Sequence, residues 1–247
     1  MQVVIVIPSR YGSTRFPGKP LAPLAGKPLI QWVYERARGA GVNARVLVAT
    51  DDSRIRDVVL AFGGEVVMTP AGARTGSDRL AHLAETIPAD AYINLQGDEV
   101  LESPRLLDDL IQAFLEAQPL DICTLKRAIT DPTELTDPNV VKVVTDRYDD
   151  ALYFSRAPIP HRRDGAGAAV EPGLYYKHLG IYIFRREALL EFARLPTGRL
   201  EACEKLEQLR ALEQGYHIKV WETRLDTLRI DRSEDLTHAE RWLGQNR

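Results

Sequence analysis

The sequence VVIVIPSRYGSTRFPGK at residues 3–19 decides how the chain is organised, because it joins an apolar run to a loop of small, hydroxyl and basic residues. β-Branched residues fill the run before Pro8 without alternating with polar ones, which is typical of a strand covered on both faces. Such a strand belongs at the centre of a parallel sheet. The segment therefore predicts an α/β protein whose functional residues follow its strands.

Strand-like and helix-like segments alternate after this first strand. Apolar spacing and end signals predict helices over residues 28–40, 53–62, 76–85 and 103–116, and strands over 45–49, 65–68 and 92–95. This alternation implies a doubly wound, mostly parallel sheet with helices on both faces.

From about residue 120 the pattern changes to a smaller mixed, partly antiparallel region. Strands are predicted over 121–125, 140–145, 151–155, 180–184 and 218–222, one helix over 201–214, and a terminal helix over 233–243. Residues 161–173 are rich in glycine and arginine, which indicates a mobile loop or lid. We interpret residues 1–247 as a single domain.

Composition excludes several classes of protein. The 247 residues include 32 basic and 35 acidic ones, giving a net charge of -3 without a basic stripe, so nucleic-acid binding is not expected. The apolar runs fall far short of the roughly 20 residues of a membrane helix, and no secretory signal is evident. The two cysteines lack metal-ligand spacing. We expect a cytoplasmic protein that has no membrane or nucleic-acid partner.

The loop after the first strand has the chemistry of a triphosphate site. Glycines allow backbone N–H groups to approach phosphate oxygens, hydroxyl groups add donors, and Arg10, Arg15 and Lys19 supply positive charge. It is not a Walker loop, because five residues separate Gly12 from Gly18 and Lys19 precedes proline. The Gly-x-Gly-x-x-Gly fingerprint of a Rossmann domain does not follow the strand either. Three prolines from Pro17 onwards predict an open, extended loop.

Two acids follow the predicted strand at 92–95, at the edge where an open α/β sheet binds its ligands. The sequence there is Gln96-Gly97-Asp98-Glu99. Magnesium prefers oxygen ligands and commonly binds one or two carboxylates together with substrate phosphate. Asp98 is therefore the best candidate for a Mg²⁺ ligand.

These motifs resemble the 3-deoxy-D-manno-octulosonate (Kdo) cytidylyltransferase family. Residues 7–21, IPSRYGSTRFPGKPL, are similar to the family's opening motif. Further matches follow in family order: GSDRL at 76–80, QGDE at 96–99, PNVVKVV at 138–144, YFSRAPIP at 153–160, HLGIY at 178–182 and LEQL at 206–209. The resemblance thus extends over nearly the whole chain. Ser9, Phe16 and Val100 depart from the family's usual residues without removing a charged group.

The resemblance implies a role for each matching residue. The nucleotide site for CTP would include Arg10, Ser13, Arg15, Lys19 and Ser77. The acidic sugar would contact Gln96, Arg156, His178, Tyr182, Glu207 and Gln208. Taken without the family, His178 indicates a structural histidine, and Glu207 with Gln208 a solvated helix face.

A second metal-binding aspartate is expected near the C-terminus, where the family has Val-Asp-Thr-Pro-Glu-Asp-Leu. Asp226 and Asp231 each match part of that motif, and we favour Asp231 because Glu-Asp-Leu follows it at the family's spacing. Lys19, Asp98 and Asp231 are then the predicted catalytic residues. Residues 1–119 would mainly bind nucleotide, 120–228 sugar and the second copy of a homodimer, and 229–247 would return to the first part.

The expected reaction joins CMP from CTP to the eight-carbon sugar acid and releases pyrophosphate, which activates the sugar for lipopolysaccharide synthesis. Three alternatives stay open. The acceptor could be an 8-amino-8-deoxy-octulosonate or an acylneuraminate, or the chain could bind nucleotide without catalysis.

Overall fold

A computed structural model describes residues 1–247 apart from 13–15, 74, 117–119, 164–169, 172, 246 and 247. The strands are β1 (Val3–Ser9), β2 (Pro23–Leu24), β3 (Lys27–Pro28), β4 (Arg45–Thr50), β5 (Val66–Met68), β6 (Ala91–Asn94), β7 (Glu99–Leu101), β8 (Ile122–Ala128), β9 (Lys142–Thr145), β10 (Ala151–Ser155), β11 (Tyr176–Arg185), β12 (Ile218–Glu222) and β13 (Thr227–Arg229). The helices are α1 (Leu29–Arg38), α2 (Ser53–Ala61), α3 (Gly76–Thr86), α4 (Arg105–Glu116), α5 (Pro132–Thr136), α6 (Arg186–Arg194), α7 (Arg199–Glu204), α8 (Leu209–Glu213) and α9 (Asp235–Gln245), with a 3₁₀ turn η1 (Lys19–Leu21).

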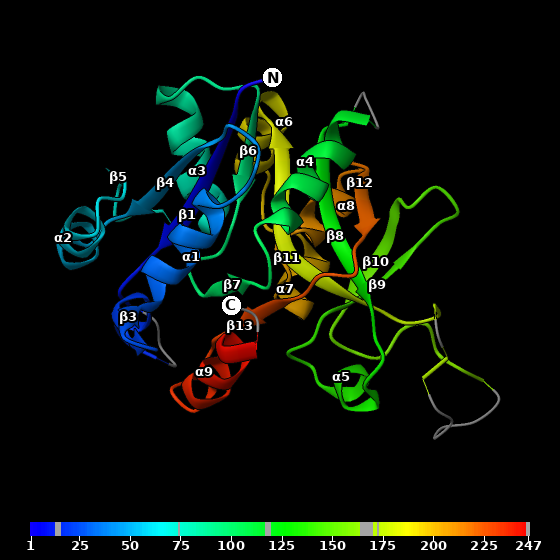
Figure 1. Cartoon of the computed structure of the whole chain (residues 1–247). Helices are drawn as coiled ribbons and strands as arrows, with labels where there is room; N and C mark the ends of the chain where they lie inside the picture. Colours follow the sequence, from blue (N-terminus) through cyan, green and yellow to red (C-terminus); the bar gives the residue numbers. More distant parts are fainter. Residues whose placement is uncertain (13–15, 74, 117–119, 164–169, 172, 246–247) are drawn as a thin grey trace.

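One large sheet with the order β10-β9-β11-β6-β1-β4-β5 forms the centre of the molecule, and β8 and β12 continue it from β11 (Figure 1). β6, β1, β4 and β5 are parallel, as the alternation predicted. β11 is antiparallel to β6, β8 and β9, which makes the second half mixed. The predicted fold class is confirmed.

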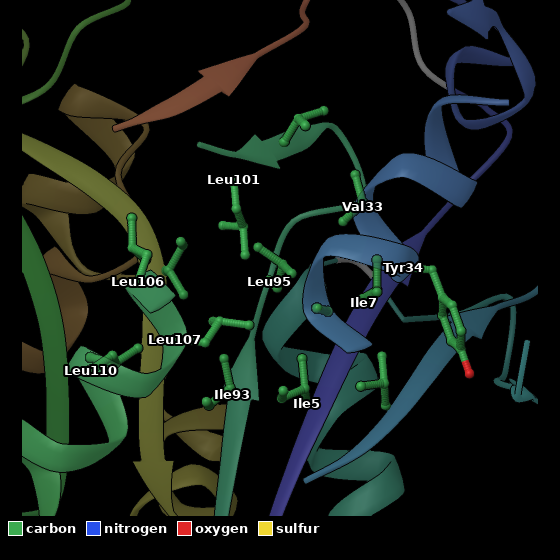
Figure 2. Close-up of a cluster of buried hydrophobic side chains, with 14 of the residues drawn as sticks. Ile5, Ile7, Val33, Tyr34, Ile93, Leu95, Leu101, Leu106, Leu107 and Leu110 are labelled. Carbon is green, nitrogen blue, oxygen red and sulfur yellow. The ribbon is translucent and has the colours of Figure 1, made fainter. Parts of the chain in front are cut away.

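Helices cover both faces of the sheet. Ile5 and Ile7 of β1 pack into a cluster with side chains of α1, α2 and α4, whereas Val4 and Val6 face α3 and α6. Figure 2 shows Ile5 and Ile7 beside Ile93 and Leu95, with Leu106 and Leu107 nearby. This two-sided burial explains why the first strand lacks polar alternation.

Local signals in the sequence fix the start of α3. This helix begins beside the loop that follows β1, residues 8–19, which we call the phosphate loop. The Thr75 hydroxyl accepts a hydrogen bond from the Asp78 N–H at 3.1 Å, and the Asp78 carboxylate accepts one from the Thr75 N–H at 3.1 Å. This reciprocal capping box begins α3 at Gly76, as the sequence predicted. The N-terminus of α3 therefore lies at the carboxyl edge of the sheet.

The prediction of one helix over 201–214 is wrong. Lys205 adopts a left-handed conformation with φ of 56° and ends α7, and α8 begins only at Leu209. A bidentate pair between the buried Arg210 and Glu201 holds the two short helices together, with N–O distances of 2.6 and 2.8 Å. The break leaves residues 205–208 outside both helices, which a helical pattern does not reveal.

Two further differences concern the phosphate loop and the C-terminal segment. Lys19–Leu21 forms one 3₁₀ turn where we expected only extended chain, since proline is tolerated in a first turn.

The sequence analysis also missed β7 and β13, which pair as a separate two-stranded sheet. α9 then packs near β2, where the Ala25 N–H lies 3.3 Å from Glu240 Oε1.

Among the residues that the structure describes, no helix is long and apolar enough to cross a membrane. Most of the proposed lid, at 164–169 and 172, lies outside the described residues.

Candidate active site

The loops that follow β1 and β6 meet because these strands are adjacent and parallel. The two loops approach each other closely at Gly97. A Cβ atom on Gly97 would lie 3.0 Å from the carbonyl oxygen of Pro8 and would also collide with the Ser9 hydroxyl. Glycine is therefore required at position 97, and it brings Asp98 next to the phosphate loop.

A polar pocket opens at this junction. Its wall includes Arg10 and Lys19 from the phosphate loop, Thr75 and Gly76 at the start of α3, and Asp98. Backbone N–H groups at a helix start together with two cations suit a polyphosphate. Ser13 and Arg15, which the sequence also assigned to the nucleotide, lie outside the described residues.

Lys19 is the centre of a charged cluster in this pocket. Its buried ammonium group forms an ion pair with Asp98, donates a hydrogen bond to the Ile230 carbonyl at 2.8 Å, and lies 3.6 Å from Asp231 Oδ1. The three predicted catalytic residues are thus brought together from three distant parts of the sequence.

β13 and the start of α9 place Asp231. The Ile230 N–H donates to the Asp98 carbonyl at 3.0 Å, so the C-terminal segment is attached directly to the acidic turn. The Asp235 carboxylate accepts hydrogen bonds from the Asp231 and Arg232 N–H groups at 2.7 and 2.8 Å. This capping arrangement orients the segment that precedes α9.

Asp226, the other candidate for the second metal ligand, has different partners. Its carboxylate pairs with Arg127 and lies 2.9 Å from Lys177 Nζ. Its backbone N–H donates to Glu102 at 2.6 Å. Asp226 does not line the polar pocket among its described residues.

Asp98 and Asp231 fit a hard divalent cation. Both carboxylates approach the same buried ammonium group, which places them in one part of the pocket. Within the described residues, no group of three or more histidine, cysteine, aspartate or glutamate side chains is arranged to hold a metal. Two carboxylates with the remaining ligands from phosphate and water is the arrangement that Mg²⁺ commonly adopts.

A second pocket adjoins the first and contains every residue that the sequence assigned to the sugar. These are Gln96, Arg156, His178, Tyr182, Glu207 and Gln208. The break between α7 and α8 brings in the last two, and β11 contributes His178 and Tyr182. Their assigned roles stay predictions, but they lie around one cavity.

Two buried oxygens in this second pocket have no hydrogen-bond partner among the described residues: Tyr182 Oη and Glu207 Oε1. Burial raises the pKa of the Glu207 carboxyl, although hydrogen bonds from Thr75 and Ser77 and the charge of Arg210 partly oppose the shift. Burial also raises the pKa of Tyr182 well above its usual value. Unsatisfied buried oxygens are costly unless a ligand pairs with them, so this pocket suits a ligand rich in hydroxyl groups.

Ser77 was predicted to contribute to the nucleotide site. Its hydroxyl donates to Glu207 Oε2 at 3.2 Å, and the residue lines the second pocket. The side chain thus links the start of α3 to the segment between α7 and α8. A contact between Ser77 and nucleotide stays a prediction.

His178 is a neutral side chain in the wall of the second pocket. Burial lowers its pKa to about 3, with a further contribution from the charge of Arg229. Its Nε2 lies 2.9 Å from Thr124 Oγ1, and that hydroxyl is 2.7 Å from the Ile181 carbonyl. Because Thr124 has one proton to donate, we assign the ring proton to Nε2.

The family resemblance assigned Arg156 to the sugar, and that contact stays a prediction. In the structure its guanidinium donates to main-chain carbonyls, from Nε to Glu204 at 2.7 Å and from Nη1 to Pro138 at 2.8 Å. Its Nη2 also lies 3.5 Å from the Lys205 carbonyl. Arg156 therefore shapes the pocket wall around the α7–α8 break.

Two charged residues of the site were given no role from the sequence: Glu99, named there only as the second acid of the QGDE motif, and Arg229, which was not named. They are directly opposite each other on β7 and β13. Burial raises the pKa of Glu99, against the effect of a hydrogen bond from Thr227. Partial loss of hydration lowers the pKa of the half-exposed Arg229, but the charges of Asp98, Asp231 and Glu99 outweigh this effect and raise the pKa overall. Only the short strand pair, which has no clear periodicity, brings them together.

Comparison with known proteins gives a consistent result. The family model described as Cytidylyltransferase matches residues 4–222. The 3-deoxy-manno-octulosonate cytidylyltransferase of Syntrophotalea carbinolica is 52% identical over 98% of this chain and 99% of its own length. The enzyme of the same name from Geobacter metallireducens is 48% identical over 96% and 95%.

Solved structures agree with these relatives. The structure of CMP:2-keto-3-deoxy-manno-octonic acid synthetase complexed with CTP is 43% identical, with a TM-score of 0.91 over 99% of both chains. HddC from Yersinia pseudotuberculosis has a TM-score of 0.71 at 16% identity, covering 98% of this chain and 100% of its own, which indicates a shared fold alone.

Proposed function

Since the chain belongs to the cytidylyltransferase family, we propose that it transfers CMP from CTP to 3-deoxy-D-manno-octulosonate and releases pyrophosphate. The observation that supports this most directly is the arrangement of two adjoining pockets. One is lined by cations and a helix start, and the other by residues with two buried oxygens that have no hydrogen-bond partner in the described part of the chain. Lys19, Asp98 and Asp231 line the first of these pockets.

The reaction is an in-line displacement, in which the anomeric hydroxyl of the sugar attacks the α-phosphorus and pyrophosphate leaves. Arg10 and Lys19 line the polar pocket, which we take as the nucleotide pocket. There their charges offset the charge that develops on the departing pyrophosphate. Holding the two substrates in register is a large part of the catalysis, worth roughly 7–11 kcal/mol for well-oriented reactants. The mechanism needs no covalent enzyme intermediate.

We infer that the enzyme uses a divalent cation, namely Mg²⁺, held by Asp98 and Asp231. When bound, the ion polarises the α-phosphate and makes the sugar hydroxyl a better nucleophile. The oxygen-only donor set supports this assignment, and the ion pairs of Asp226 with Arg127 and Lys177 favour Asp231 as the second ligand.

The second pocket supports the choice of acceptor. Glu207 and Tyr182 line this pocket, and Glu207 Oε1 and Tyr182 Oη, which have no hydrogen-bond partner among the described residues, can pair with sugar hydroxyl groups. The same Glu207 oxygen also suits an ammonium group, so an 8-amino-8-deoxy-octulosonate is the acceptor to test against the hydroxylated sugar. Binding of nucleotide without catalysis is disfavoured by the two aspartates around Lys19.

Pyrophosphate release measured with CTP, UTP and GTP against Kdo, its 8-amino analogue and an acylneuraminate tests this function. We expect release with CTP and Kdo only when Mg²⁺ is present. The Asp98→Asn variant should lose at least about 100-fold in turnover. Asp57→Asn is the matched control, because the Asp57 side chain is 63% exposed and far from the pocket lining. Failure of the wild type to release pyrophosphate with this pair would reject the function.

We further infer that the enzyme is a cytoplasmic homodimer whose product serves lipopolysaccharide synthesis. Exposed apolar side chains at the edge of the mixed half, Tyr148, Leu152 and Trp221, support a surface for a second copy. Sedimentation velocity of the wild type and Leu152→Glu tests the dimer, which the variant should weaken. Cell fractionation and lipopolysaccharide yield after depletion test the other two points.

A further inference from the structure

The chemistry of the proposed acceptor creates an electrostatic problem at the junction of the two pockets. In a 2-ulosonic acid the attacking anomeric hydroxyl and the carboxylate are attached to the same carbon. When the hydroxyl reaches the α-phosphorus, the carboxylate must therefore lie beside the α-phosphate. Two anions at such short range repel each other, particularly where protein excludes water. A cation at the junction would relieve that repulsion.

Arg229 occupies this junction. The second pocket, proposed to bind the sugar, is called the acceptor pocket. Among the described residues, Gln96 and Arg229 are the two that line both the nucleotide pocket and the acceptor pocket. Gln96 is neutral, and its amide donates to Asn94 at 3.1 Å. Arg229 is thus the charged side chain that faces both substrates.

The strand pair fixes the backbone of Arg229 while leaving its side chain accessible. β13 pairs with β7 in a register that sets Arg229 opposite Glu99, whose carboxylate accepts a hydrogen bond from Thr227 at 2.7 Å. Arg229 Nε lies 3.5 Å from Asp231 Oδ1, and 53% of the Arg229 side chain is exposed, compared with 19% for Asp231. The half-exposed Arg229 side chain thus lines both pockets and has donors available to a ligand.

Other cations of the acceptor pocket are less well placed for the carboxylate. The guanidinium group of Arg156 donates to the carbonyls of Glu204 and Pro138, which hold the pocket wall. Lys205 lines the acceptor pocket but does not line the nucleotide pocket in its described part. A planar guanidinium also matches the two oxygens of a carboxylate, whereas an ammonium group is a point charge.

We propose that Arg229 is an acceptor-binding residue whose guanidinium group binds the sugar's carboxylate and holds it beside the α-phosphate of CTP. This inference rests on the proposed function. It assigns the selection of an acid at the anomeric carbon to a residue outside the predicted sugar site. It also explains a cation opposite the buried Glu99, which would otherwise repel an incoming carboxylate.

The test compares Kdo with its C1 carboxamide, which keeps the shape and loses the charge. Calorimetry measures binding of each to the full-length enzyme in the presence of Mg²⁺ and a CTP analogue with an α,β-methylene bridge, which cannot release pyrophosphate. The wild type should bind the acid about 10–100-fold more tightly than the amide, as expected for hydrogen bonds to a charged group. Arg229→Gln should bind the two within about threefold, and Arg229→Lys should retain part of the preference.

A matched control is Arg232→Gln, which removes an exposed cation one residue from Asp231 without changing the lining of either pocket. It should keep the wild-type preference for the acid. Two results would overturn the inference. In the first, Arg229→Gln keeps the full preference for the acid over the amide. In the second, the variant weakens binding of the acid and of the amide equally and raises the Mg²⁺ concentration that is required, which would mean that Arg229 only supports Asp231. Wild-type pyrophosphate release with CTP and Kdo, measured in parallel, separates these outcomes from failure of the proposed function.

Discussion

The side-chain nitrogen of Lys19 lies 3.6 Å from the carboxylate of Asp231. The same ammonium group pairs with Asp98, so it stands close to both proposed ligands of the metal. Lys19 therefore competes with Mg²⁺ for these carboxylates when no nucleotide is bound. Phosphate oxygens of CTP give the ammonium group alternative partners.

Replacing Lys19 with methionine should consequently strengthen Mg²⁺ binding to the free enzyme while reducing turnover. Removal of one positive charge about 4 Å from a carboxylate is expected to tighten Mg²⁺ binding about tenfold. Turnover should fall by at least about 100-fold, because charge on the departing pyrophosphate is no longer offset. Calorimetric Mg²⁺ titration and pyrophosphate release measure the two effects. Unchanged Mg²⁺ affinity would contradict the competition.

The two candidate aspartates should separate cleanly when each is changed to asparagine. Asp231→Asn is expected to raise the Mg²⁺ concentration for half-maximal turnover by about tenfold or more, because a ligand loses its charge. Asp226→Asn breaks the pairs with Arg127 and Lys177, so it should instead lower the free energy of unfolding by about 1–3 kcal/mol. Magnesium titrations of turnover and urea unfolding distinguish these outcomes. The reverse assignment of effects would make Asp226 the second ligand.

The sequence predicts the parallel half of the sheet well because each of its elements has a strong local signal. The β-branched run at 3–7, the Thr75 cap and the glycine turns all specify their own structure. The α7–α8 break depends instead on a buried pair between Arg210 and Glu201, a tertiary contact. The β7–β13 pair joins segments far apart in the chain. Long-range pairings of short strands leave little trace in local patterns.

The residues of the site also divide into those with a local sequence signal and those placed by tertiary contacts. Lys19 and Asp98 belong to compact motifs that follow strands, so their chemistry was evident from the sequence, and the structure brings them into contact. Arg229 lies on a three-residue strand and was not predicted to face any ligand. Its position depends on Glu99 across the strand pair, which only the folded chain provides.

Tyr182→Phe should separate binding of the acceptor from stability. The Tyr182 hydroxyl is buried without a hydrogen-bond partner among the described residues, so its removal should leave the free energy of unfolding unchanged or raise it by up to about 2 kcal/mol. If the hydroxyl binds the sugar, KM for the acceptor should rise about 5–50-fold with little change in KM for CTP. Steady-state kinetics and urea unfolding measure both. A stability loss with normal kinetics would show that the hydroxyl is structural.

The buried His178 should make the protein less stable as the pH falls. Its pKa in the folded protein is about 3, below its ordinary value of 6.5. Between these pH values the unfolded chain binds a proton that the folded protein does not, so the free energy of unfolding decreases with falling pH. For one such group the slope reaches about 1.4 kcal/mol per pH unit.

Comparison of the wild type with His178→Gln isolates this effect, because Glu99 and Glu207, whose pKa values are raised by burial, are present in both proteins. Urea unfolding between pH 6.5 and 4 should show a wild-type slope steeper by up to about 1.4 kcal/mol per pH unit. His217→Gln serves as the control, since the His217 side chain is 82% exposed. Equal slopes for the wild type and His178→Gln would mean that the folded protein accommodates a proton on His178, and the assignment of a neutral ring that donates to Thr124 would then fail.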